Sequence, residues 1–115
     1  MTIARHNAGP RMSGAVVHNN TVYLAGQVAA DASAGVKGQT EQVLKKIDDL
    51  LKAAGTDKSK LLSATIFLAD IRGFDEMNAA WDAWVVAGSA PGRATVEARL
   101  ANSKYLVEIV AIAAV

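Results

Sequence analysis

The segment "YLVEIVAIAAV", residues 105–115, restricts the possible folds of this chain more than any other stretch. Apolar residues stand at both odd and even positions, and Glu108 is the single charged residue among them. Successive side chains of a strand point to opposite faces of a sheet, so a strand of this composition needs cover on both faces. The fold must therefore place protein layers on both sides of its sheet.

Upstream, the pattern predicts a hairpin followed by a helix. In "SGAVVHNNTVYLAGQVA", residues 13–29, two short β-rich runs flank Asn19 and Asn20, which tolerate the positive φ of a tight turn. Residues 30–39 are polar and glycine-containing, which favours a loop. Apolar residues then recur at helical spacing until Gly55 ends the segment: Val43, Ile47, Leu50, Leu51 and Ala54.

The second half of the chain predicts a buried strand, a helix and two further strands. "KLLSATIFLAD", residues 60–70, is apolar at nearly every position, as expected of a strand buried on both faces. The next helix has an apolar stripe of Phe74, Met77, Trp81 and Trp84 or Val85, and it ends near Gly88 before the Pro91 corner. Strands over 93–100 and 105–114 complete the order ββαβαββ, a single α+β domain over residues 1–115 with two helices on one face of a mixed sheet.

Composition limits the class of partner. The two helices cover only one face, so we expect a second subunit to cover the other, and a hydrophobic fraction of 51% agrees with this. Twelve basic against 11 acidic residues, without clustering, argues against nucleic-acid or membrane binding and favours a small molecule. The chain has no cysteine, and His6 and His18 lack the spacing of a metal site. We expect no metal, no signal peptide or membrane span, and a cytoplasmic location.

Arg93 is the strongest candidate for a functional side chain. It follows a Pro-Gly corner and opens a strictly alternating strand in which Thr95, Glu97 and Arg99 share its face. If this strand forms an antiparallel hairpin with the last one, Arg93, Thr95 and Glu108 lie on one face in either plausible register. A lone carboxylate in an apolar strand needs a partner. Either Arg93 and Glu108 form a structural ion pair, within one chain or across a subunit interface, or Arg93 binds a carboxylate ligand while Glu108 binds water or transfers a proton.

With these motifs in hand, the sequence resembles the RidA family, also called the YjgF or reactive-intermediate deaminase family. The resemblance covers nearly the whole chain. The stretches that carry it are the first hairpin with its Gly-Gln pair, "AAG", "ATIFLADI", "FDEMNAAWDAW", "PGRATVEARL" and "VEIVAIAAV". It implies a chorismate-mutase-like α+β fold, a homotrimer with sites at subunit interfaces, and no cofactor. The implied activity is hydrolysis of enamines and imines, such as 2-aminoacrylate, 2-iminopropanoate and 2-iminobutanoate, to 2-keto acids and ammonia.

The resemblance also implies roles for individual residues. Arg93 matches the arginine that binds the substrate carboxylate, and Glu108 matches the glutamate that places the attacking water. Thr95 stands where many members have cysteine, Gly26 lies in the pocket segment, and Trp84 lies near an aromatic position that lines the cleft from a neighbouring subunit.

The chain also departs from the family pattern at the predicted pocket. Met12 replaces a tyrosine, and Ala25 stands where serine is common. These changes predict a more apolar pocket. They keep open an alternative function, a non-catalytic trimer that binds small carboxylates such as 2-keto acids. An RNA-directed role, described for some members, is disfavoured by the near-neutral charge.

Overall fold

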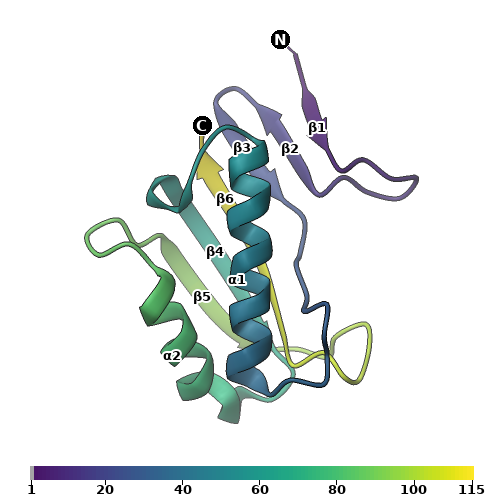
Figure 1. Cartoon of the computed structure of the whole chain (residues 1–115), viewed down its shortest axis with the longest axis vertical. Coiled ribbons are helices and arrows are strands. Elements are labelled where there is room, and N and C mark those ends of the chain that lie inside the picture. The colour runs from purple at the N-terminus through teal and green to yellow at the C-terminus, as the bar shows by residue number, and fades with distance from the viewer. Residues whose placement is uncertain (1) are drawn as a thin grey trace.

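A computed structural model describes residues 2–115 as one mixed sheet carrying two helices on the same side (Figure 1). The six strands are hydrogen-bonded in the order β1-β2-β3-β6-β4-β5. Their bounds are β1 Ala4–His6, β2 Ala15–His18, β3 Thr21–Leu24, β4 Leu61–Leu68, β5 Gly92–Glu97 and β6 Val107–Ala114. The helices are α1 Val36–Ala53 and α2 Phe74–Trp84, with short 3-10 turns at Lys58–Lys60 and Ile71–Gly73. The predicted α+β architecture, with both helices on one face, is confirmed.

The predicted hairpin is present, and one strand precedes it. Strands β2 and β3 pair antiparallel around Asn19 and Asn20, whose φ angles are +52° and +60°. The left-handed region favours asparagine among non-glycine residues, which explains the turn. The sequence pattern does not predict the preceding strand, β1, whose residues Ala4–His6 pair with β2. Three residues are too few for a periodic pattern to reveal a strand.

Helix α1 begins earlier than the pattern predicted. Residues 36–39 are helical, so the expected loop over 30–39 is too long. The N-cap, Gly35, supplies no side-chain hydrogen bond. Instead, the Thr40 hydroxyl donates to the Val36 carbonyl at 2.7 Å, and both polar atoms of the Gln39 side chain are hydrogen-bonded. At the other end Gly55 has φ +84°, as predicted for a residue that terminates the helix.

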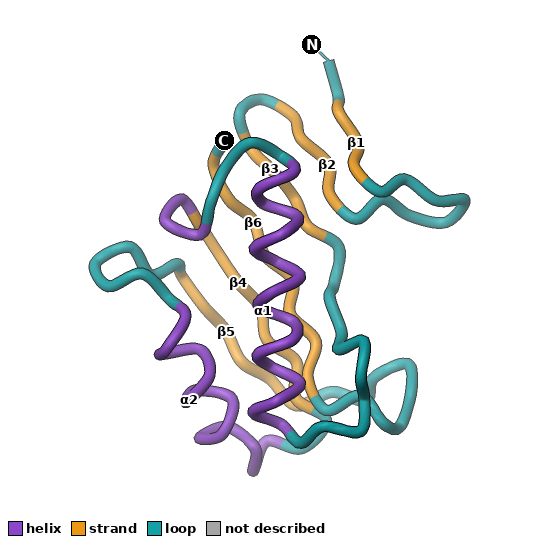
Figure 2. The backbone as a smooth tube through the Cα atoms, in the orientation of Figure 1, coloured by secondary structure: helices purple, strands orange, loops and turns teal. Residues whose placement is uncertain are grey.

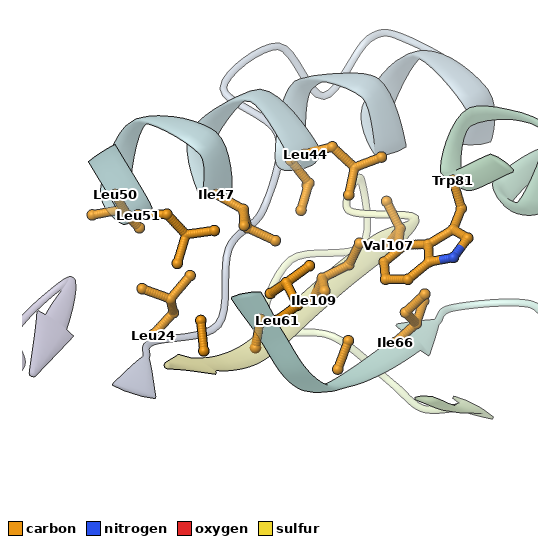
Figure 3. Packing of buried hydrophobic residues seen from close by; sticks show 14 of the residues in the cluster. Leu24, Leu44, Ile47, Leu50, Leu51, Leu61, Ile66, Trp81, Val107 and Ile109 are labelled. Atoms are coloured by element: carbon orange, nitrogen blue, oxygen red, sulfur yellow. The ribbon is translucent and has the colours of Figure 1, made fainter. Parts of the chain in front are cut away.

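The core lies between the helices and the sheet (Figure 3). Leu44, Ile47 and Leu51 of α1 point toward Ile66 of β4 and Ile109 of β6, and all five are at most 2% exposed. Trp81 of α2 enters the same cluster from the side. Apolar spacing at positions i, i+3, i+4 and i+7 therefore sets which face of each helix meets the sheet.

The predicted hairpin between the last two strands is wrong. β5 runs parallel to β4, and β4 lies between β5 and β6 (Figure 2). Helix α2 connects β4 to β5, and a strand-helix-strand connection of this length returns the chain parallel to its first strand. β5 thus becomes an edge strand, and the registers assigned to Arg93 and Glu108 change with it.

On the face of the sheet opposite the helices, most side chains of the two central strands are only half-buried. Residues of β4 and β6 alternate between buried positions on the helix side and half-buried positions on the other side. Tyr23 and Val96 lie on that open face with 47% and 43% of their surface exposed. The prediction that another subunit covers it stays a prediction.

Candidate functional site

Arg93 lies on the helix side of the edge strand, against α2. Its register partner is Ala64, which pairs in turn with Ala111, and both alanines are buried under the helices. The guanidinium Nη1 donates to Oδ1 of Asn78 at 2.8 Å. The guanidinium carbon lies 5.2 Å from the centroid of the Trp81 ring and 5.8 Å from that of Phe74. Two aromatic faces and one amide therefore fix the cation.

No carboxylate neutralises this cation within the described chain. The ion pairs among residues 2–115 are Lys45 with Asp49 and Arg72 with Asp70. Arg93 is half-buried, and its hydrogen-bonding contacts in that range are to Asn78 and, at 4.0 Å, the sulfur of Met77. A guanidinium has five N–H donors, so most of this fork can still bind an anion.

Thr95 lies two residues along the same face of β5. It pairs with Ile66, and its hydroxyl oxygen is buried without a hydrogen-bond partner among the described residues. An unpaired buried hydroxyl is unfavourable, and such groups are often satisfied by a ligand or water. Thr95 and Arg93 thus form one polar edge beside the aromatic rings of α2.

Glu108 lies on the opposite, open face. It pairs with Phe67 of β4, which pairs with Val96 of β5. Phe67 lies three residues after Ala64, the β4 partner of Arg93, so the side chains of Glu108 and Arg93 point to opposite faces of the sheet. A Cβ atom at position 26 would overlap the Oε2 of Glu108 and lie 3.0 Å from its Cδ, so only glycine leaves room for the carboxylate there. The segment is fixed to β6 by two backbone bonds between Gln27 and Ile109, at 2.9 and 3.1 Å.

A hollow of about 240 Å³ lies beside Glu108. It is lined by Phe67, Ala98, Arg99, Leu100, Ala101 and Glu108. Most of these side chains are apolar, and the two charged ones have opposite signs. The hollow is large enough for a small organic acid and offers a carboxylate that can hold a water molecule.

The expected proximity of Arg93, Thr95 and Glu108 is therefore wrong within one chain. Arg93 and Thr95 face the helices, whereas Glu108 faces away from them. A structural ion pair between Arg93 and Glu108 is excluded within one chain in the same way, and a pair across a subunit interface stays a prediction. The strand alternation was correct, but the partner strand was not.

Three other predicted residues lie at different places. Ala25 precedes Gly26 and donates its N–H to the Gly14 carbonyl at 2.9 Å. Met12 lies in the loop before β2 with 65% of its surface exposed. Trp84 does not reach Arg93, because its indole N–H donates to Asp48 at 3.0 Å and Lys58 lies 5.2 Å from its ring. Trp81, one turn earlier on α2, lies beside the arginine of its own chain, and the prediction that Trp84 lines the cleft of a neighbouring subunit stays a prediction.

Asn78 was missed by the sequence analysis, although the pattern contains a signal. It stands four residues after Phe74 and three before Trp81, so it is a polar residue within the stripe that faces the sheet. A polar side chain at such a position needs a partner from the strand below. Among residues 2–115, no cluster of three His, Cys, Asp or Glu side chains could hold a metal ion.

A known family model matches nearly the whole of this chain. The model for "Endoribonuclease L-PSP" matches residues 2–115. The chain belongs to the RidA, or YjgF, family. A RutC family protein, YoaB of Escherichia coli (strain K12), is 53% identical over 115 residues, covering all of both chains. A 2-iminobutanoate/2-iminopropanoate deaminase of Rattus norvegicus is 34% identical over 107 residues, covering 88% of this chain and 77% of the relative.

A solved structure of the RidA family has the same fold. A YjgF family protein from Neisseria meningitidis is 43% identical and superimposes with a TM-score of 0.96. The match covers 99% of this chain and 95% of the Neisseria chain. The RidA family thus includes relatives named as imine deaminases and more similar relatives whose names state only the family. In the described part of this chain, no helix is long and apolar enough to span a membrane.

Proposed function

We propose that this protein hydrolyses reactive 2-imino acids and their enamine tautomers to 2-keto acids and ammonia. The observation that carries the proposal is Arg93: a half-buried guanidinium, fixed by Asn78 and Trp81, with no carboxylate partner among residues 2–115. A cation in this setting is suited to bind an anionic ligand in bidentate fashion. The substrate named for the rat relative, 2-iminobutanoate, carries both a carboxylate and a C=N bond.

The site is completed between copies of the chain. Arg93 lies on the edge strand, and Glu108 lies on the open face, so one copy cannot bring both to one ligand. A closed ring in which the open face of one copy meets the β5 edge of the next places Glu108 and Gly26 opposite Arg93 and Thr95. The exposed Tyr23 and Val96 of the open face supply apolar contact area for such an interface. We propose a homotrimer, as the family resemblance implies.

The chemistry needs only these groups and water. Arg93 holds the carboxylate so that the C=N carbon faces a water molecule bound by Glu108 of the adjoining copy. Water adds its oxygen to that carbon, one water proton goes to Glu108, and Glu108 passes this proton to the imine nitrogen, which gives a tetrahedral carbinolamine with a hydroxyl and an amino group. Glu108 then takes the hydroxyl proton and delivers it to the amino nitrogen, so that the C–N bond breaks, the keto group forms and ammonia leaves. Imines hydrolyse readily, so orientation and one base are sufficient.

The test is a kinetic comparison of single variants and their mixture. An amino-acid oxidase generates 2-iminobutanoate in situ, and its loss is followed with wild type, Arg93→Ala and Glu108→Ala. Each charge-assisted bond contributes about 1.5–3 kcal/mol, so we expect Arg93→Ala to lower kcat/KM at least about a hundredfold. Arg72→Ala is the matched control, because Arg72 pairs with Asp70 on the surface with 89% of its side chain exposed.

Mixing tests the shared site. When Arg93→Ala and Glu108→Ala chains are refolded together in equal amounts, about a quarter of the interfaces in a ring pair an intact Arg93 with an intact Glu108. Recovery of that fraction of activity supports the shared site, and no recovery contradicts it. If wild type binds 2-keto acids through Arg93 but accelerates no imine loss, the protein is a carboxylate-binding module and the hydrolase proposal fails.

A further inference from the structure

Gln39 is a completely buried polar residue whose bonds leave its own helix. It is 0% exposed, although it lies only three residues into α1. Its side-chain nitrogen donates to the carbonyls of Ala32 at 3.2 Å, Ala34 at 3.0 Å and Lys104 at 3.0 Å. Its side-chain oxygen accepts the Leu106 N–H at 2.9 Å. We call these four contacts the Gln39 network.

The Gln39 network joins the two segments that meet at Glu108. One segment runs from Gly26, which contacts the Glu108 carboxylate, to Ala34. The other ends at Leu106, one residue before the start of β6 and two residues before Glu108. The network therefore determines how the segment carrying Gly26 and the start of β6 lie relative to each other.

The neighbouring polar residues of α1 reach only one of these segments. Gln42 accepts from the Asp31 N–H at 2.9 Å and donates to its carbonyl at 3.1 Å. Lys46 donates to the Val28 carbonyl at 2.8 Å. Both hold the 26–34 segment on the helix, but within the described chain neither bonds to residues 102–106. The Gln39 amide supplies two N–H donors and an oxygen acceptor together, which neither glutamate nor methionine can do.

We propose that Gln39 is a positioning residue for Glu108: it acts from the helix side of the sheet, through both segments, on a carboxylate that lies on the opposite face. This inference rests on the proposed imine hydrolysis, in which Glu108 binds the attacking water. Small displacements of such a group lower the rate of the chemical step more than they lower binding. Arg93 lies on a different strand and edge, so substrate binding is retained.

The experiment compares Gln39→Met with Gln42→Met in the full chain. Both variants remove a glutamine amide from α1, but only the first disconnects residues 104–106. We expect Gln39→Met to lower kcat about tenfold to a hundredfold, with KM within about twofold, and Gln42→Met to leave both near wild type. Gln39→Asn, which keeps a neutral amide but is one methylene too short to reach both segments, is the second variant if Gln39→Met does not fold.

A double-mutant cycle separates positioning from a general loss of structure. In a Glu108→Ala background Gln39→Met is expected to lower kcat no further, within about twofold, because the group it positions is gone. An equal loss of kcat in both backgrounds would overturn the proposal. A lower melting temperature with wild-type kcat would overturn it as well.

Amide exchange makes this inference separable from the proposed function. The Leu106 N–H is expected to exchange slowly in wild type and in Gln42→Met, and at least about tenfold faster in Gln39→Met. Fast exchange of Leu106 in wild type overturns the Gln39 network itself. If wild type hydrolyses no imine while exchange follows the expected pattern, the proposed function fails and Gln39 holds the two segments for another purpose.

Discussion

Replacing Asn78 with aspartate places an internal competitor for the ligand beside Arg93. The Oδ1 atom of Asn78 accepts from Nη1 of Arg93 at 2.8 Å. Aspartate has nearly the same shape, so the hydrogen bond is kept while a full negative charge is added. The new ion pair then occupies the guanidinium that binds the substrate carboxylate in the proposed function, and we expect a more stable protein with weaker ligand binding.

The size of the effect follows from the contact distance and the burial. Two unit charges about 4 Å apart attract by about 4 kcal/mol at the effective dielectric constant of about 20 that suits groups near a protein surface. Removing the new carboxylate from water at a half-buried position offsets part of this gain. A remainder of about 1.5–3 kcal/mol corresponds to a fall of roughly tenfold to a hundredfold in affinity for a carboxylate ligand.

Calorimetric titration with a 2-keto acid measures the affinity, and thermal unfolding measures the stability. Asn20→Asp is the control, because it adds the same charge at an exposed turn whose positive φ aspartate tolerates. Unchanged 2-keto acid affinity in Asn78→Asp would refute the reasoning, since it would mean that the ligand carboxylate does not use this guanidinium.

Two further perturbations test other parts of the structure. Gly26→Ala places a Cβ where the Oε2 of Glu108 lies, so the carboxylate must move. We expect kcat to fall at least about tenfold with little change in KM. A wild-type kcat in this variant would mean that Glu108 takes no part in the reaction. The Arg72 guanidinium, with its N–H bonds, lowers the pKa of Asp70 from 3.8 to about 2. A carboxyl group whose pKa is lower in the folded than in the unfolded protein stabilises the folded state at pH values above the unfolded-state pKa. The free energy of unfolding is therefore expected to fall as the pH drops from 3.8 to about 2. Urea unfolding of Asp70→Asn should lack this part of the decrease, and an equal decrease in both proteins would contradict the assignment.

Most of the fold could be predicted because its signals are local. The Asn19-Asn20 turn, the apolar spacing of α1 up to Gly55 and the apolar run of β4 each depend on residues close in sequence. The start of α1 was placed too late because the bonds that stabilise its first turn come from Gln39 and Thr40, and a glycine-containing stretch conceals them. Strand β1 was missed because its pairing with β2 is its only structural signal.

The candidate site was harder to predict because it depends on which strands are neighbours. Alternation correctly put Arg93 and Thr95 on one face, but the face of Glu108 relative to them depends on β4 lying between β5 and β6. The helix between β4 and β5 was the available evidence for a parallel pair, since a crossover of this kind favours parallel strands. Asn78 could have been found as the polar member of an apolar stripe, whereas the Gln39 network joins residues more than 60 positions apart.

Because Arg93 and Glu108 lie on opposite faces, the proposed function gives the open face of the sheet a part in catalysis as well as in subunit contact. If each site needs Arg93 from one copy and Glu108 from the next, the apolar contacts that hold the copies together also set the distance across which water must attack. Residues such as Val96, with no polar atom in the side chain, then influence catalysis through the interface. In the proposed trimer, the two-sided apolar pattern of the last strand and the lone carboxylate within it have one explanation: the strand that another subunit would cover is also the strand that would present Glu108 to that subunit.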